Sequence, residues 1–179
     1  MSRRPLLSCR RSGIEGTSMY DITIDEFPPD RLAAIVHWRN DPAVNRYLRQ
    51  GILTLETVQA WYTQYFSRAE HQLFAVYADK TLIGYCTLSH IDTTHRSCEI
   101  GIVIGDPHYW NKGLGASVIT RLTTLAFTRY HLHRVYAVMQ GGLSHPGVAL
   151  RKWASSMRAD GRMHGRSTEP LSIFVTMRF

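Results

Sequence analysis

Apolar residues recur with two different periods along the chain, and these periods predict its strands and helices. Alternation of apolar and polar residues indicates a strand, whereas apolar residues three and four positions apart indicate a helix. Strands are expected at residues 20–27, 72–78, 82–90, 96–104, 134–139 and 171–179. Helices are expected at about residues 32–40, 43–49, 54–66, 113–130 and 146–156, the first preceded by Asp30 as a candidate N-cap. The three central strands, joined by short turns, predict an antiparallel meander.

The length of the chain fits a single domain of ordinary size. It has 179 residues, of which 44% are hydrophobic, so it can bury a core without a disulfide or a metal. No apolar run approaches the roughly 18 residues that span a membrane. The first 18 residues are rich in Arg and lack the apolar stretch of an export signal. We expect residues 1–18 to be a disordered leader, with Met19 as an alternative start, and residues 19–179 to form the domain.

Charge and cysteine content narrow the classes of function. The chain holds 21 Lys and Arg against 14 Asp and Glu, a net charge of +7. Four of these basic residues and one acidic residue lie in the first 18 positions, which leaves +4 for the rest. This mild charge disfavours nucleic acid as a partner, although the Arg-rich leader keeps a nucleic-acid binder open as a further alternative. The cysteines, Cys9, Cys86 and Cys98, lack CxxC spacing, which favours free thiols in the cytoplasm over a disulfide or zinc site.

One stretch of the sequence carries recognisable chemistry. An apolar strand at residues 96–104 is followed by a loop that contains Gly113 and Gly115, and a long helix starts there. Glycines let backbone N–H groups approach an anion, and a helix N-terminus adds unpaired donors and a partial positive charge. Lys112 adds a full positive charge. The stretch therefore predicts a pyrophosphate-binding loop, although it matches neither the Walker sequence nor the complete GxGxxG fingerprint.

This arrangement resembles the GCN5-related N-acetyltransferase (GNAT) superfamily, and more closely its RimJ/RimL-like branch. The family's motif, Arg/Gln-x-x-Gly-x-Gly/Ala, falls on residues 110–115, where Trp110 replaces the Arg or Gln. Trp-Arg-Asn-Asp-Pro at residues 38–42 and Leu-His-Arg-Val-Tyr at residues 132–136 also match. The resemblance covers almost all of residues 20–179. It implies one α/β (α+β) domain, whose central, mixed, mostly antiparallel twisted sheet is flanked by helices and has a splayed fourth and fifth strand.

The resemblance also implies acetyl-CoA as the co-substrate. Family members bind its pantetheine arm along the fourth strand and its pyrophosphate at the following loop, and the acetyl group sits where the strands splay. The strand contacts expected here are Ile102, Val103 and Ile104. The loop contacts expected here are Asn111, Lys112, Gly113, Leu114, Gly115 and Ala116. No metal site is expected.

The mechanism that the resemblance implies is direct transfer, in which an amine attacks the thioester and a base accepts its proton. Glu99, at the start of the fourth strand, is the candidate base. Its alternative role is to pair with Arg96 or Arg134. His71 and His90 are further candidates for the base, and a surface or hydrogen-bonded imidazole is the alternative for each.

The candidate general acid is where the sequence departs from the family. Many members carry Asn-x-x-Ser/Ala followed by Tyr on the helix after the fifth strand. Here His145 stands in the place of the Asn, and no Tyr follows Tyr136. Ser144, His145 and Ser155 are the candidates to protonate the thiolate that leaves, and departure of the free CoA thiolate without an acid is the alternative. The departure is also compatible with a weakened or altered activity.

The leading prediction is a cytoplasmic N-acetyltransferase for a primary amine. The acceptors that the resemblance implies are amino sugars, other small amines and protein N-termini, so the partner is a small-molecule or peptide amine. The mild positive charge of the domain favours an anionic sugar nucleotide over a polycationic aminoglycoside. The alternative, suggested by the region around His145, is a non-catalytic acyl-CoA-binding module. No membrane partner is expected, and a homodimer is compatible with the sequence.

Overall fold

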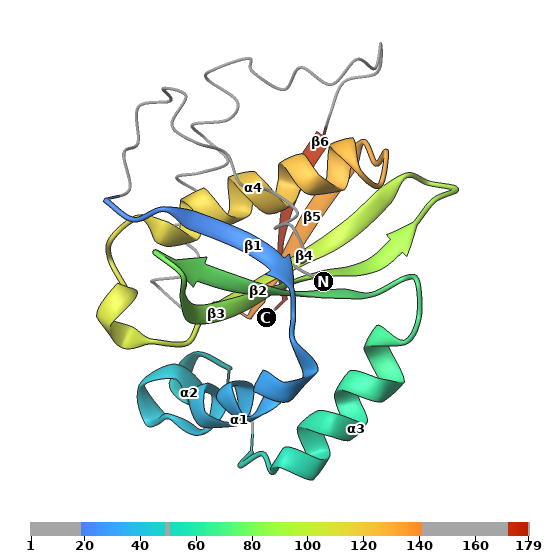
Figure 1. Cartoon of the computed structure of the whole chain (residues 1–179). Coiled ribbons are helices and arrows are strands. Elements are labelled where there is room, and N and C mark those ends of the chain that lie inside the picture. The colour runs from blue at the N-terminus through green and yellow to red at the C-terminus, as the bar shows by residue number, and fades with distance from the viewer. Residues whose placement is uncertain (1–18, 49–50, 141–171, 179) are drawn as a thin grey trace, which may run out of the picture.

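The structure is a computed structural model, and it describes residues 19–48, 51–140 and 172–178. Its six-stranded sheet has the order β1-β2-β3-β4-β5-β6 (Figure 1). The strands are β1 Ile22–Glu26, β2 Gln72–Ala78, β3 Thr81–Asp92, β4 Ser97–Ile104, β5 Arg134–Gln140 and β6 Ser172–Arg178. Neighbours from β1 to β4 pair antiparallel, whereas β4 with β5 and β5 with β6 pair parallel. The expected mixed, mostly antiparallel sheet is therefore confirmed.

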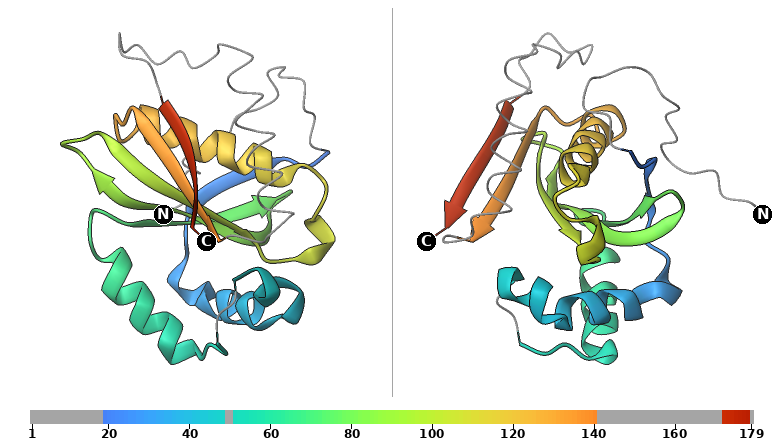
Figure 2. Two further views of the ribbon diagram at one scale, coloured as in Figure 1. Left: turned by 180° about the vertical axis from the view of Figure 1, so that it is seen from behind. Right: turned by 90° about the vertical axis from the view of Figure 1, so that its left-hand side faces the viewer.

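Helices cover both faces of this sheet. They are α1 Leu32–Asn40, α2 Pro42–Leu48, α3 Leu55–Phe66 and α4 Leu114–Thr128, with 3-10 turns η1 Pro29–Arg31 and η2 Pro107–Tyr109. The helix α4 lies along one face, and α1, α2 and α3 lie on the opposite face (Figures 1 and 2). Each of the four α-helices begins and ends within about two residues of its expected range, whereas the two 3-10 turns were not expected. The helix expected at residues 146–156 lies outside the described residues.

The alternating strand pattern divides the apolar residues between two cores. Ile24, Val76 and Leu88 pack with the stripe of α4 that includes Leu122. The opposite faces of the strands bury a second cluster against α1 and α3, which includes Ile35, Trp38, Val58 and Tyr85. Because successive side chains of a strand point to opposite faces, one sheet supports both cores.

Two local expectations were wrong. Asp30 does not cap α1, because Pro29 already starts the 3-10 turn η1 that contains Asp30, and Arg31 occupies the N-cap position. Ile91 was expected in a turn, but β3 continues through it to Asp92. The pairing of β3 with β4 shifts between Ser89 and Asp92, and this bulge turns the Ile91 side chain into the core, where it is 8% exposed.

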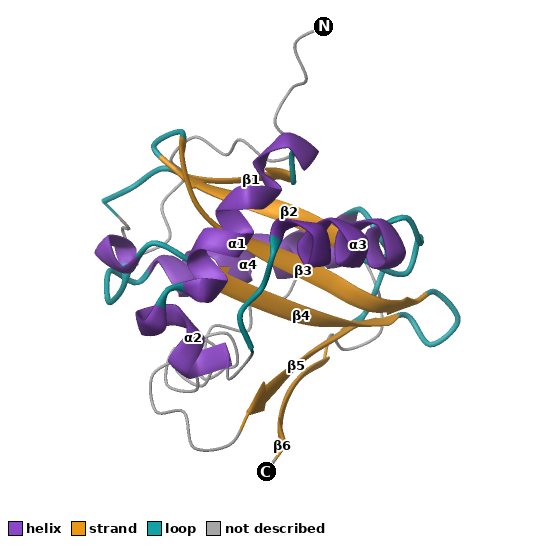
Figure 3. Ribbon diagram, turned by 90° about the horizontal axis from the view of Figure 1, so that it is seen from below, coloured by secondary structure: helices purple, strands orange, loops and turns teal. Residues whose placement is uncertain are grey.

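The feature that positions the candidate site is the separation of β4 from β5. The two strands pair at only three positions, the last of which joins Glu99 to Tyr136. On its other side, β4 stays paired with β3 as far as Ile104. Within the described residues, positions 100–104 therefore have a strand partner on one side alone. Figure 3 shows β5 and β6 turning away from β4 beyond this point, so the expected splay is confirmed.

The part of the chain that the structure describes contains no helix long and apolar enough to cross a bilayer.

Candidate functional site

The loop before α4 presents an uncapped helix N-terminus. Gly113 is the N-cap residue in the left-handed conformation, with φ of +76°, and Asn111 is also left-handed, with φ of +59°. The N–H of Ser117 reaches back to the carbonyl of Gly113 at 3.4 Å, so the N–H groups of residues 113–116 precede the first intrahelical bond. No side chain caps this end. Four backbone donors and the positive end of the helix dipole are thus available to an anion.

The glycines of the loop differ from those of the sheet. A Cβ added at Gly113 or Gly115 would meet nothing within 4 Å. In contrast, a Cβ at Gly84 would collide with the carbonyl oxygen of Val103, and one at Gly105 with the ring of Trp38. Packing therefore requires glycine at positions 84 and 105 but does not require it at position 115. The open space above the α4 N-terminus is large enough for a ligand to approach the backbone closely.

Lys112 does not point freely into solvent from this loop. Its ammonium group donates to the Tyr20 hydroxyl at 2.9 Å and lies over the rings of Tyr20 and Tyr109, 5.2 Å and 5.5 Å from their centroids. Cation–π contacts of this kind hold the charge close to the loop. A phosphate contact by Lys112 stays a prediction, and it would compete with the hydroxyl of Tyr20.

Trp110, which replaces the Arg or Gln of the motif, ties the loop to the end of β4. Its indole N–H donates to the carbonyl of Ile104 at 2.8 Å. The residues expected beside a pantetheine arm, Ile102, Val103 and Ile104, are only partly buried, because β5 has already separated from β4. Positions 100–104 are therefore an open strand edge, of which Ile100 is buried in the α4 core and Ile102, Val103 and Ile104 are partly buried.

Glu99 lies at the position where the separation begins. Its neighbours Cys98 and Ile100 face the α4 core, so its side chain points to the opposite face of the sheet. One carboxylate oxygen of Glu99 is 3.4 Å from Nδ1 of His90, and the Glu99 side chain is 28% exposed. A carboxylate that is partly shielded from water and next to an imidazole is able to accept a proton from an amine.

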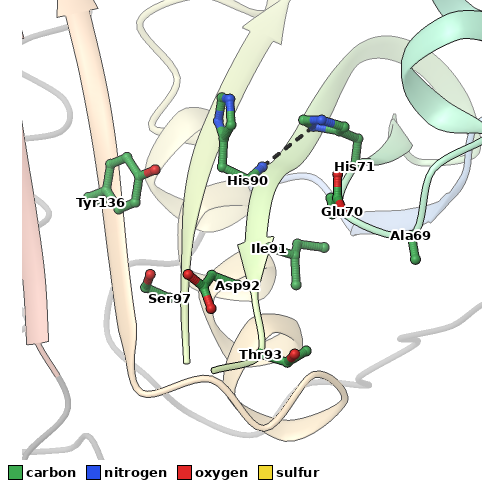
Figure 4. Close-up of a pocket in the computed structure, with 9 residues that line it drawn as sticks. All are labelled: Ala69, Glu70, His71, His90, Ile91, Asp92, Thr93, Ser97 and Tyr136. Atoms are coloured by element: carbon green, nitrogen blue, oxygen red, sulfur yellow. Dashed lines mark hydrogen bonds between the residues drawn. The ribbon is translucent and has the colours of Figure 1, made fainter. Parts of the chain in front are cut away.

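A pocket of about 650 Å³ opens beside His90, the partner of Glu99 (Figure 4). Tyr136 stands on one side of it and His71 on the other, with His90 between them. The residues that line the pocket are Ala69, Glu70, His71, His90, Ile91, Asp92, Thr93, Ser97 and Tyr136. Two of these residues, Glu70 and Asp92, are acidic, and none is Lys or Arg.

Hydrogen bonds and burial lower the pKa values of two groups that line this pocket, Asp92 and His71. Asp92 accepts from the backbone and ring of His95 and from the backbone of Thr94, and these bonds hold the pKa of the Asp92 carboxyl below its ordinary value. Burial, with repulsion from His90, lowers the pKa of His71. The pocket therefore combines an ionised carboxylate with a neutral imidazole, and its charge favours a cation.

The predicted site residues fall into two groups. The strand and loop contacts follow one another around the open end of β4, and Glu99 lies five residues, roughly 16 Å of extended chain, before Ile104. Ser144 and His145 lie outside the described residues. Among the described residues, no group of three His, Cys, Asp or Glu side chains could hold a metal ion.

Sequence reasoning missed the walls of the pocket. Glu70, Asp92 and Tyr136 come from three separate segments, and the bulge of β3 brings them round one opening. The only available signal was the density of polar residues between two apolar strands, which is equally typical of an exposed hairpin turn.

A comparison with known families identifies the chain. Residues 21–142 match the acetyltransferase (GNAT) domain. The chain belongs to this family. The match spans the splayed strands and the α4 loop, and so the elements that form the candidate site are elements of a GNAT domain.

Individual relatives are acetyltransferases as well. Spermidine N(1)-acetyltransferase of Vibrio cholerae serotype O1 is 37% identical over 68 residues, which are 38% of this chain and 39% of that protein. The matched part thus spans well under half of the length of this curated relative. The crystal structure of spermidine N-acetyltransferase from Vibrio cholerae in complex with CoA and spermine superposes with a TM-score of 0.64 at 22% identity, covering 75% of this chain and 78% of that one. A structure titled as a probable acetyltransferase gives 0.61 at 21% identity, covering 73% and 76%. These likenesses establish the shared fold.

Proposed function

We propose that this GNAT protein is an acetyl-CoA-dependent N-acetyltransferase that acts on a primary amine. The observation that carries the proposal is the open edge of β4, which leads directly to the uncapped N-terminus of α4. Ile102, Val103 and Ile104 would contact the pantetheine arm. The backbone of residues 111–116 would bind the pyrophosphate, for which Gly113 and Gly115 leave space.

The reaction joins the amine nitrogen to the acetyl carbon and breaks the bond between that carbon and sulfur. An ammonium group first gives one proton to a base and becomes nucleophilic. The second nitrogen proton is lost after attack, and the CoA thiolate takes up a proton as it leaves. Glu99 is the proposed base, and it lies where β4 and β5 begin to separate. Ser144 and His145 are retained as proposed acids for the thiolate.

The acceptor we propose is a small cationic amine of the polyamine class. The pocket beside His90, which contacts Glu99, is lined by Glu70 and Asp92, and no Lys or Arg lines it, so it attracts ammonium groups and repels phosphates. The charge of the pocket therefore favours a cationic acceptor, whereas the net charge of the domain had favoured an anionic sugar nucleotide. The names of the Vibrio cholerae relatives, which specify spermidine, support the same class.

We also propose that the chain belongs to the RimJ/RimL-like branch, on the residues of the Trp-Arg-Asn-Asp-Pro segment and Trp110. A cytoplasmic location fits the two buried free thiols, Cys86 and Cys98, since a reducing compartment keeps thiols unpaired. An oligomer of identical chains is a further proposal, for which a solved relative described as dodecameric is the support.

Calorimetry and a thiol-release assay test the proposed function. Acetyl-CoA and CoA should bind with micromolar affinity, and NADPH should not bind. Turnover should be measured with spermidine, a neutral-chain monoamine and a nucleotide amino sugar, and spermidine should give the highest kcat/KM. Absence of acetyl-CoA binding would overturn the proposal. Binding without turnover of any amine would leave the acyl-CoA-binding module as the better explanation.

Glu99→Gln separates chemistry from binding in the same assay. Loss of the carboxylate should lower kcat by about 10²-fold or more while the affinity for CoA stays nearly constant, because Glu99 lies at the far end of β4 from the loop. A kcat equal to that of the wild type at every pH would remove Glu99 from the mechanism.

A further inference from the structure

The backbone of His90 has an unusual conformation at the mouth of the pocket. Its φ is +52°, a left-handed value that non-glycine residues rarely adopt. It lies within the interval from Ser89 to Asp92 where the register of β3 against β4 shifts. Unusual backbone geometry of this kind persists only where surrounding contacts hold it, and it concentrates at functional sites.

The side chain of His71 contacts the backbone of His90 and holds it in this conformation. The backbone N–H of His90 donates to Nδ1 of His71 at 3.4 Å, and the two rings meet edge to face at a centroid distance of 5.3 Å. The His71 side chain is buried, and the ring of Tyr65 packs on it at 4.7 Å. Because Nδ1 of His71 accepts a hydrogen bond, the proton of this neutral ring is on Nε2.

The held backbone aims the His90 ring at Glu99. Nδ1 of His90 is 3.4 Å from the Glu99 carboxylate, and the His90 side chain is 60% exposed, against 28% for Glu99. The Glu99 carboxylate, which is partly shielded where β4 and β5 separate, is therefore in contact with the His90 imidazole. The His90 ring in turn is exposed both to the pocket and to solvent. Imidazole is the side chain best suited to exchange protons with water near neutral pH.

We propose that His90 carries the proton of the acceptor from Glu99 to solvent, and that His71 is the positioning residue that keeps His90 in place. This inference rests on the proposed acetyltransferase function and extends it. The ammonium group gives its proton to Glu99, which passes it to the neutral ring of His90. The imidazolium ring then releases the proton to water, and both groups return to their starting states without any further reactant.

The charged surroundings of His90 support this direction of transfer. Glu70 and His71 approach from the segment before β2, Asp92 from β3, Glu99 from β4, and Tyr136 from β5. Asp92 is already bonded to His95, which leaves Glu99 as the carboxylate paired with His90. Glu99 is therefore the carboxylate from which the His90 ring can receive a proton.

The test compares His90→Gln with His37→Gln, an exposed histidine of α1 outside the pocket. For the wild type, kcat with spermidine should rise with pH, because only the neutral ring of His90 accepts a proton. In His90→Gln this rise should disappear and kcat should fall by about 10²-fold. His37→Gln should retain the wild-type profile. Calorimetric affinity for acetyl-CoA should be equal in all three proteins.

Four further variants separate positioning and proton transfer from a loss of stability. His71→Asn keeps an acceptor near the position of Nδ1 and should retain the pH profile, whereas His71→Leu should lose it as His90→Gln does. Added imidazole should restore part of the activity of His90→Ala and none of that of Glu99→Ala.

The possible failures are distinguishable. A wild-type pH profile in His90→Gln, in an enzyme that turns over, would overturn the inference and leave the proposed function intact. A wild-type protein that binds acetyl-CoA but acetylates no amine would overturn both.

Discussion

Single glycines of this chain serve different purposes, because packing requires glycine at some positions and the proposed binding requires it at another. Gly84 and Gly105 are glycine because a carbonyl oxygen and an indole ring occupy the space of a Cβ. Gly115 has no such neighbour. The same residue type therefore serves the fold at two places and the proposed binding loop at a third.

Two substitutions test this distinction. Gly115→Val should leave the free energy of unfolding within about 1 kcal/mol of wild type, since the site is open, but should abolish measurable CoA binding by blocking the backbone. Gly84→Ala should lower the free energy of unfolding by about 2 kcal/mol, because the Val103 carbonyl must move. Urea denaturation and calorimetry measure the two quantities. CoA binding by Gly115→Val within a few-fold of wild type would show that the pyrophosphate lies elsewhere.

The two described cysteines are expected to be inert in the native protein. Burial raises the pKa of both thiols, that of Cys98 to about 12, so almost no thiolate exists at pH 8. In a Cys9→Ser protein, a disulfide reagent should label neither thiol at pH 8, and both should react after denaturation. The sign of the pH effect follows, because folding favours the protonated thiol: this stability is present below pH 9 and is lost as the pH rises towards 12. Rapid labelling of the native protein would contradict the burial of these side chains.

At the scale of elements, the side chain of Asn40 links the end of α1 to the segment that enters α3. The amide of Asn40 donates to the carbonyl of Leu53 at 2.7 Å and accepts from its N–H at 2.8 Å. Both bonds are partly buried and join the end of α1 to the residue before Thr54, the N-cap of α3. This pair of bonds fixes the direction in which the chain enters α3.

Asn40→Ala should therefore lower the free energy of unfolding by about 2 kcal/mol, because it leaves both backbone groups of Leu53 without their partner. Gln59→Ala, on an exposed position of α3, is the matched control and should change it by less than about 0.5 kcal/mol. Chemical denaturation of the two variants side by side gives the comparison. An equal effect from both would show that water replaces the Asn40 amide without cost.

Elements of strong periodicity were predictable, and their interruptions were not. The stripe of α4 and the alternation of β1 follow directly from the sequence, and their bounds agree with the structure. The bulge at His90 leaves no trace in the hydrophobic pattern, because it is set by pairing with a strand and by the contact of His71. The meeting of His90 with Glu99 depends on that bulge. For the same reason, Glu99 and His90 were each found as candidates, but their pairing was not predicted.

At the scale of the whole molecule, the sheet consists of two parts. A four-stranded antiparallel part, β1 to β4, is joined to the parallel ribbon β5–β6 by three paired positions. The helix α4 packs on the antiparallel part, where Leu122 and Leu125 meet β-strand residues such as Val76. A ligand that fills the space between β4 and β5 would therefore be expected to restrain a junction that has few hydrogen bonds of its own.

Acetyl-CoA should accordingly stabilise the protein as a whole. At a free concentration of 100 times its dissociation constant, the expected gain in the free energy of unfolding is about 2.7 kcal/mol. Hydrogen exchange should slow most along β4 beyond Glu99 and along β5. Gly115→Val, with the same ligand, is the control and should show neither effect. Equal protection in this variant would mean that the ligand binds away from the loop.

The three-position junction between β4 and β5 also has an evolutionary consequence. Continuing the pairing beyond Glu99 and Tyr136 would add hydrogen bonds and make the domain more stable, since a strand edge without a partner is a cost to folding. Under the proposed function, the same change would close the space that the thioester needs. Selection for a more durable protein and selection for turnover therefore act in opposite directions on residues 100–104, and stabilising substitutions compatible with activity are to be sought elsewhere in the chain.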